Sequence, residues 1–311
     1  MSESAADINR SIFNEEAASY DDKHRKLNER LTRELQARLD FIGVDWASDD
    51  EDSDDGEREE NDKKPRREVR LLDYACGTGM MSRALLPYTT QCVGMDISEK
   101  MVAAYNMRAE NQGLSSDEMH AVLGDLAAEN TDDTLSSPEL FNFDIAVVGG
   151  GFHHFGNPGL AAKRLVERLK PGGVLLIWDF LPHAPSHGHH HHGHHHHDQH
   201  HHDGDGSEGK GKEPSAHNIY HSVMHHGFSE PQMREIFTAA GAGTDFKLEH
   251  IGGGFTIAGH GQRKEGQQPA SGAWEDETQE GTGNEDGDDK DKDKAAFRRE
   301  VFFARGTKGG A

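Results

Sequence analysis

A small-residue turn in the first third of the chain is the stretch best suited to bind a ligand. The stretch LLDYACGTGMMSRAL, residues 71–85, runs from an apolar segment ending at Asp73, through Gly77 and Gly79, into a helical pattern. A strand, a glycine-rich bend and a helix bring free N–H groups and the positive helix end together, which favours an anionic group. Three interpretations stay open at this point: a nicotinamide-cofactor site, an S-adenosyl-L-methionine (SAM) site, and a purely structural turn.

Further polar residues follow later apolar segments. Asp96 ends CVGMDIS, where a carboxylate can accept hydrogen bonds from both hydroxyls of a ribose, although an acid is also common at a helix start. Asp125, in VLGDL, can meet an exocyclic amine of adenine or be an ordinary loop residue. His153 and His154 follow another apolar segment, and two interpretations of them stay open: a catalytic base, or rings packed within the loop. A second group of histidines lies in HSVMHHGF, residues 221–228.

Strand-like and helical patterns alternate from residue 69 onward, which predicts a parallel sheet with both faces covered by helices. Strands are expected at 69–74, 91–95, 119–123, 143–148 and 174–179, and helices at 79–86, 99–111 (capped by Ser98) and 159–169. Before this core, residues 8–42 predict a helix. After it, a helix at 230–240 precedes strands at 246–257 and 297–304, which are expected to form a hairpin around an insertion.

Charge and composition concentrate in separate blocks. The net charge is -23 and the hydrophobic fraction is 33%, but residues 49–62 and 275–294 contribute about -9 and -7 of that charge. No basic stripe is present, so no nucleic-acid partner is expected. Two cysteines favour a reduced, cytoplasmic protein, with the nucleus left open. No run has membrane-spanning length, and the N-terminal residues lack a signal-peptide pattern.

A histidine tract from residue 183 to 202 interrupts the second half of the chain. Imidazoles at this density bind divalent metals adventitiously, but no fixed ligand geometry follows from the tract, so no metal site is predicted. The expected organisation is an N-terminal helical lid (1–47), an acidic disordered linker (48–68), a core (69–182), the histidine-rich insertion (183–216), the C-terminal part of the core (217–261), an acidic disordered insertion (262–294), and a final strand and tail (295–311).

In its order of motifs, the chain resembles the class I SAM-dependent methyltransferases, closest to the small-molecule group typified by ubiquinone and menaquinone methyltransferases (types 11 and 12). The matching stretches are LLDYACGTG, GMDIS, GDL, FHHF and LKPGG, with FNEEAASYDDK similar to the N-terminal segment of the family. Ala75 stands where the family has its first glycine, and Ser82 breaks the dinucleotide pattern at its third glycine. The resemblance implies an α/β fold with a Rossmann-like seven-stranded sheet, mostly parallel with an antiparallel C-terminal hairpin.

The resemblance also implies residue roles. Asp73 would orient the glycine-rich loop or the methionine ammonium group, and Asp96 would hold the ribose. Position after the strand expected at 143–148, rather than the resemblance, makes His153 and His154 candidates for a base, with His154 preferred. The implied cofactor-binding residues are Tyr20, Asp73, Ala75, Cys76, Gly77, Gly79, Asp96, Ile97, Asp125, Leu126 and Gly149. The predicted function is SAM-dependent methyl transfer to a small-molecule acceptor. The alternatives are a protein or RNA methyltransferase, and a metal-binding scaffold that has lost activity.

Overall fold

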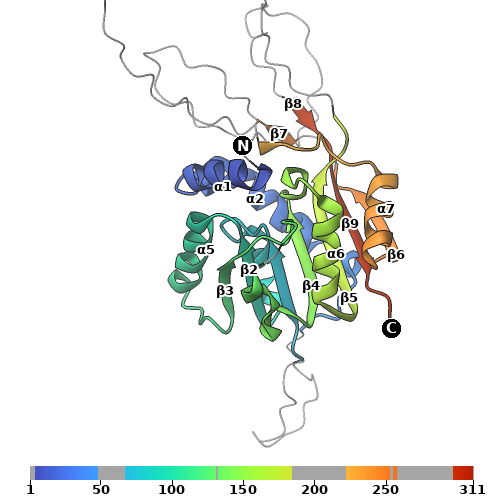
Figure 1. Ribbon diagram of the computed structural model, residues 1–311, viewed down its shortest axis with the longest axis horizontal. Helices are drawn as coiled ribbons and strands as arrows, with labels where there is room; N and C mark the ends of the chain where they lie inside the picture. Colours follow the sequence, from blue (N-terminus) through green and yellow to red (C-terminus); the bar gives the residue numbers. More distant parts are fainter. Residues whose placement is uncertain are drawn as a thin grey trace, which may run out of the picture.

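The computed structural model describes residues 4–47, 67–130, 132–183, 222–252, 255–257 and 297–310, and it is organised around one seven-stranded sheet (Figure 1). The strand order is β3-β2-β1-β4-β5-β9-β6. The strands are β1 (Arg70–Tyr74), β2 (Gln91–Asp96), β3 (Met119–Leu123), β4 (Phe143–Gly149), β5 (Leu169–Phe180), β6 (Thr244–His250) and β9 (Val301–Thr307). The first five pair in parallel, whereas β9 runs antiparallel to both β5 and β6. The predicted α/β class and mixed sheet are therefore confirmed.

Helices cover both faces of this sheet, because neighbouring residues on each strand point to opposite sides. On one face, α6 (Pro158–Arg168) and α7 (Glu230–Ala240) enclose an apolar cluster that includes Leu72 and Val148. On the other face, α2 (Tyr20–Gln36), α4 (Met80–Leu85) and α5 (Glu99–Asn111) pack over a cluster that includes Leu71 and Val147. Because both faces of the sheet are covered, the sequences of the central strands are almost continuously apolar.

The N-terminal segment differs from the single helix predicted at 8–42. The structure has three helices there: α1 (Ala5–Glu16), α2 and α3 (Leu39–Ile42). The break between α1 and α2 falls at 17–19, where the sequence is Ala-Ala-Ser and contains no glycine or proline to signal it. Leu31 and Leu35 of α2 are buried in the core, so tertiary packing rather than local sequence sets the bend.

Two other predicted boundaries are wrong. The strand expected at 174–179 begins at Leu169, because the chain pairs with Phe143 of β4 before a register shift. The strand expected at 246–257 is divided: β6 ends at His250, and β7 (Phe255–Ile257) pairs with β8 (Phe297–Arg299) in a separate two-stranded sheet. The acidic segment 48–66, the residues 184–221 and the residues 258–296 lie outside the described residues, and so do the predictions made for them.

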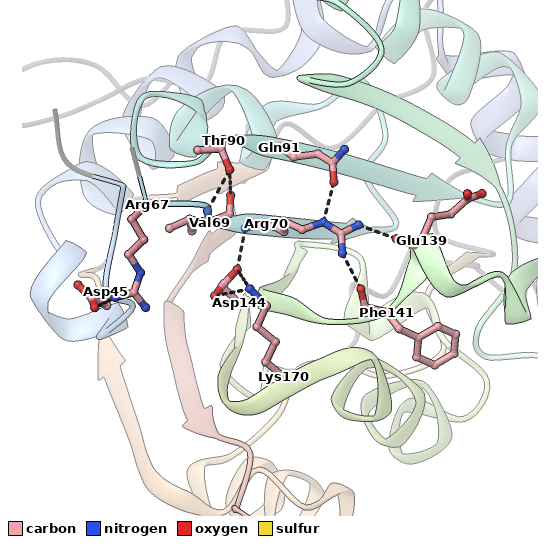
Figure 2. A network of polar contacts seen from close by, with 10 residues as sticks. All are labelled: Asp45, Arg67, Val69, Arg70, Thr90, Gln91, Glu139, Phe141, Asp144 and Lys170. Atoms are coloured by element: carbon pink, nitrogen blue, oxygen red, sulfur yellow. Dashed lines mark hydrogen bonds and ion pairs between the residues drawn. The ribbon is translucent and has the colours of Figure 1, made fainter. Parts of the chain in front are cut away.

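A polar network joins the amino ends of the central strands, at the end opposite the predicted ligand site (Figure 2). The guanidinium of Arg70 donates to Gln91 at 2.7 Å and to two main-chain carbonyls in the loop before β4. The Asp144 carboxylate accepts from the Arg70 main-chain N–H at 2.8 Å and from Lys170 at 2.9 Å. These contacts tie the amino ends of β1, β2, β4 and β5 together.

Candidate functional site

A cavity of about 580 Å³ opens where β1, β2 and β4 end, beneath α1. Its floor comes from the strand ends, through Tyr74, Asp96 and Gly149, and α1 contributes Asn9 and Phe13 from above. Figure 1 shows α1 lying across this edge of the sheet. Open parallel sheets bind ligands at this position, so the cavity is the candidate ligand site.

The glycine-rich turn is held on both sides by buried carboxylates. Asp96 accepts hydrogen bonds from the main-chain N–H groups of Gly77 at 2.8 Å and of Ser98 at 2.9 Å. On the other side, Asp73 Oδ2 accepts from the Ser82 N–H at 3.1 Å and from the Ser82 hydroxyl at 2.7 Å. Gly77 has φ +52°, and a Cβ there would meet no atom within 4 Å, so its backbone lies open to a ligand.

Burial changes the acidity of both carboxyls. Loss of solvation raises the pKa of Asp73 to about 7, and the hydrogen bonds from Ser82 only partly oppose this. Burial likewise raises the pKa of Asp96 to about 6, against the lowering effect of its bonds to main-chain N–H groups. The Asp96 charge raises the pKa of Asp73 further. The site therefore holds two acids whose ionised forms are disfavoured until a cation approaches.

Ala75 adopts the left-handed conformation that favours glycine, with φ +53°. For an L-residue with a Cβ this conformation costs about 1–2 kcal/mol. The methyl group fits because Gly151 faces it, where a Cβ would lie 2.9 Å from that of Ala75. Ala75 lines the cavity. The position at which this chain has alanine instead of the family's glycine is therefore a strained residue within the site.

The far wall of the cavity is built around Tyr74 and Asp125. The Asp125 carboxylate accepts from the Tyr74 hydroxyl at 3.2 Å and from the Ala127 N–H at 2.8 Å. The Tyr74 hydroxyl in turn accepts from the Leu126 N–H at 3.0 Å, and Phe155 packs against the Tyr74 ring. Ile97 lines the same cavity. This wall combines flat apolar surface with one carboxylate.

His154 is buried and lines the cavity, where its ring contacts Phe13 edge-on. Its Nδ1 lies 2.9 Å from the main-chain carbonyl oxygen of Ser222. A carbonyl can only accept, so Nδ1 carries the proton and Nε2 keeps its lone pair. Burial, followed by the adjacent His153, lowers the pKa of His154 well below 6.5, which keeps the ring neutral.

His153 has a different environment. Its main-chain N–H and its Nδ1 both lie within hydrogen-bonding distance of the buried Asp179 carboxylate, at 3.0 and 2.9 Å. Its ring packs on His154 with centroids 4.0 Å apart, but it does not line the cavity. The sequence named both histidines, and the structure gives only His154 access to the ligand site.

The lid helices are fastened to the glycine-rich turn through Asp21. Its carboxylate accepts from the Thr78 hydroxyl and pairs with Arg108 at 2.8 Å and Arg83 at 3.7 Å. Tyr20, next in the chain, reaches the cavity, and burial raises its pKa to about 12. The segment predicted as a lid therefore contributes directly to the walls of the site.

A second cavity, of about 60 Å³, adjoins the first and shares with it Tyr20, Ala75, Gly77, Gly149 and Gly150. Asp73 and Cys76 reach this smaller cavity, as does Trp178 at the end of β5.

Two predicted site residues line neither cavity. Gly79 has φ +91°, and a Cβ there would lie 2.8 Å from the Tyr105 ring, so it serves packing. Leu126 is fully buried behind the wall.

The sequence did not single out Asn9, Phe13, Phe155 or Trp178 as site residues. Phe155 lies within FHHF and Trp178 follows a strand pattern, so position at a strand end is the signal that would have found them. Asn9 and Phe13 depend on how α1 folds over the sheet, and nothing in the local sequence shows this.

Residues 72–175 match the family model described as methyltransferase domain. This part of the chain is similar to methyltransferase domains. An uncharacterized methyltransferase of Schizosaccharomyces pombe is 31% identical over 140 residues, which are 45% of this chain and 49% of the relative. A ubiquinone biosynthesis O-methyltransferase of Caulobacter is 28% identical over 121 residues, which are 39% of this chain and 44% of the relative.

The chain thus spans about half the length of the curated relatives it matches. The solved YcgJ structure from Bacillus subtilis is 16% identical, with 78% of this chain and 93% of that one covered and a TM-score of 0.43. Among the described residues, no helix is long and apolar enough to cross a membrane. Within the same ranges, no group of three or more His, Cys, Asp or Glu side chains is arranged to hold a metal ion.

Proposed function

We propose that the chain is a SAM-dependent methyltransferase that acts on a small-molecule acceptor. The observation that carries the proposal is the cavity at the strand ends, where an open glycine-rich turn lies between Asp73 and Asp96. The named methyltransferase relatives and the matched domain support it. We place the protein in the cytoplasm because both cysteines are free.

The residues of the site fit this cofactor. SAM is cationic at its sulfonium and ammonium groups, and Asp73, Asp96 and Asp125 surround the cavities. Gly77 leaves room for close approach to the backbone, and Gly149 lines both cavities. Each Asp96 oxygen accepts one main-chain bond and has capacity for a ribose hydroxyl.

When bound, SAM supplies a methyl group on a sulfonium sulfur, which is open to in-line displacement. Alignment and exclusion of water are worth about 7–11 kcal/mol of a barrier of this kind. Here α1 and the rings of Tyr74, Phe155 and Phe13 line the cavity and would enclose the acceptor. His154 is assigned as the base, because its Nε2 lone pair is the one left free by the Ser222 bond.

The first experiment is calorimetry of the full chain with SAM and with NADH. We expect micromolar SAM binding and no NADH binding. The variant Asp96→Asn keeps the size of the side chain and removes its charge, and loss of a charged hydrogen bond should weaken SAM binding about 10-fold or more. Asp132→Asn is the matched control, since Asp132 caps a short helix on the surface.

Two results would count against the proposal in different ways. Failure of the unaltered protein to bind SAM rejects the function itself. Equal SAM affinity in Asp96→Asn and the unaltered protein rejects only the ribose contact. Incubating the protein and a cell extract with methyl-labelled SAM then tests the acceptor class, because label in protein or RNA rather than in the small-molecule filtrate contradicts a small-molecule acceptor.

A further inference from the structure

Two buried polar atoms without partners belong to residues that line the same small cavity. Trp178 is 4% exposed and its indole Nε1 has no hydrogen-bond partner, and Asp73 is 1% exposed and its Oδ1 has none. Both residues line the cavity of about 60 Å³. An unpaired buried polar group is destabilising and rare, so two in one small space indicate a ligand that is to satisfy them.

Trp178 is held firmly against the loop after β4. It pairs with Gly149 in the sheet, and the indole lies where side chains of Gly149 and Gly150 would otherwise be. A Cβ on Gly149 would lie 2.9 Å from Nε1, and one on Gly150 would lie 2.5 Å from the ring. The two glycines therefore fix the indole, with its N–H beside Gly149, which lines both cavities.

The two atoms have opposite hydrogen-bonding character. The indole N–H can only donate, and the ionised Asp73 carboxylate can only accept. Asp73 Oδ2 is already used by Ser82, which leaves Oδ1 for a ligand. A single donor and a single acceptor in one cavity match the two charged groups of an α-amino acid, a carboxylate and an ammonium.

We propose that Trp178 recognises the amino-acid end of SAM, with its indole N–H donating to the carboxylate, beside Asp73, to which the family resemblance already assigns the ammonium group. This rests on the proposed function. The smaller cavity joins the larger one at Gly77 and Gly149, so the rest of the cofactor would extend toward Asp96. His24 and Asn28 of α2 also line the smaller cavity.

Water is the rival occupant. A volume of about 60 Å³ matches two water molecules at liquid density, and water would satisfy both atoms without selecting any ligand. The two cases differ in one respect. Only direct recognition makes the loss of ligand affinity on replacing Trp178 depend on the carboxylate of the ligand. The experiment therefore compares SAM with decarboxylated SAM, which lacks only that group.

Calorimetry of the full chain gives the first readout. Trp178→Phe keeps the aromatic packing and removes the N–H, and we expect SAM affinity to fall about 10- to 100-fold, as for other hydrogen bonds to charged groups. Affinity for decarboxylated SAM should change less than about threefold, which also shows that the variant is folded. Trp46→Phe is the matched control, because its indole donates to the Leu39 carbonyl away from the site. An equal loss for both ligands, or no loss for either, overturns the proposal.

A second readout needs no variant at the site and holds even if Trp178→Phe fails to fold. The indole N–H signal of Trp178 is followed by NMR in the protein carrying Trp46→Phe and Trp274→Phe, which leaves one tryptophan of the three, during titration with each ligand. SAM should move this signal markedly downfield, as a new bond to a carboxylate does, and decarboxylated SAM should not. The same shift with both ligands overturns the proposal. Absence of SAM binding in the unaltered protein instead rejects the underlying function.

Discussion

Replacing Asp73 by Asn should make the protein less sensitive to rising pH. Burial raises the pKa of Asp73 from 3.8 to about 7, so between these values the folded state holds a proton that the unfolded state has lost. Stability falls with pH wherever the folded state binds more protons. With 1.36 kcal/mol for each pKa unit, the ionisation of this one group should remove about 2–3 kcal/mol of unfolding free energy between pH 5 and pH 8. The Asp73→Asn variant has no proton to release at this position and would lose none of that free energy.

The measurement is urea unfolding of both proteins without ligand at pH 5, 6, 7 and 8. Ionisations of groups that do not interact with Asp73, including the many histidines, occur in both proteins and cancel in the difference, whereas that of Asp96 is coupled to Asp73. The asparagine side chain can still accept hydrogen bonds from Ser82. Its amide changes the unfolding free energy by an amount that does not depend on pH. The unfolding free energy of Asp73→Asn minus that of the unaltered protein should therefore rise with pH up to about pH 7 and then level off. If this free-energy difference stays constant across the pH range, the Asp73 carboxyl does not have a raised pKa and the reasoning is refuted.

Two other changes have clear expected outcomes. Ala75→Gly should stabilise the protein by up to about 1 kcal/mol in urea unfolding, because relief of the left-handed strain exceeds the entropy cost of glycine. The control Ala103→Gly, within α5, should destabilise it by about 1 kcal/mol, and the same sign in both variants would contradict the strain. His154→Asn keeps a donor for the Ser222 carbonyl and removes Nε2, so label transfer to the small-molecule filtrate should fall about 100-fold or more with SAM affinity unchanged. Unchanged transfer would exclude His154 as the base.

The sequence predicted elements well where local signals agree with packing. The bounds of β3 and α7 match the prediction, and Ser98 caps α5 as expected, its hydroxyl accepting from the Met101 N–H at 3.1 Å. The predictions failed where tertiary contacts decide. The break between α1 and α2 follows from burial of Leu31 and Leu35, and the early start of β5 follows from pairing with β4.

The site shows the same division. Position at strand ends correctly brought Asp96, Asp125, Gly149 and His154 to one cavity, because parallel strands end at a common edge. Gly79, named from motif likeness alone, lines neither cavity and faces Tyr105. Trp178 reaches the smaller cavity only because β5 lies beside β4, and this pairing is not written in the local sequence.

The two carboxylates that hold the glycine-rich turn also carry an electrostatic cost. Each is buried, and the Asp96 charge raises the pKa of Asp73, so the empty site opposes their full ionisation near neutral pH. A ligand carrying positive charge would remove that cost, which an uncharged nucleoside could not do. Binding of a cation near pH 6 should then release protons, because it favours the ionised carboxylates. The same residues that lower the stability of the free protein thus prepare the site for a cationic ligand, as expected where function and stability compete.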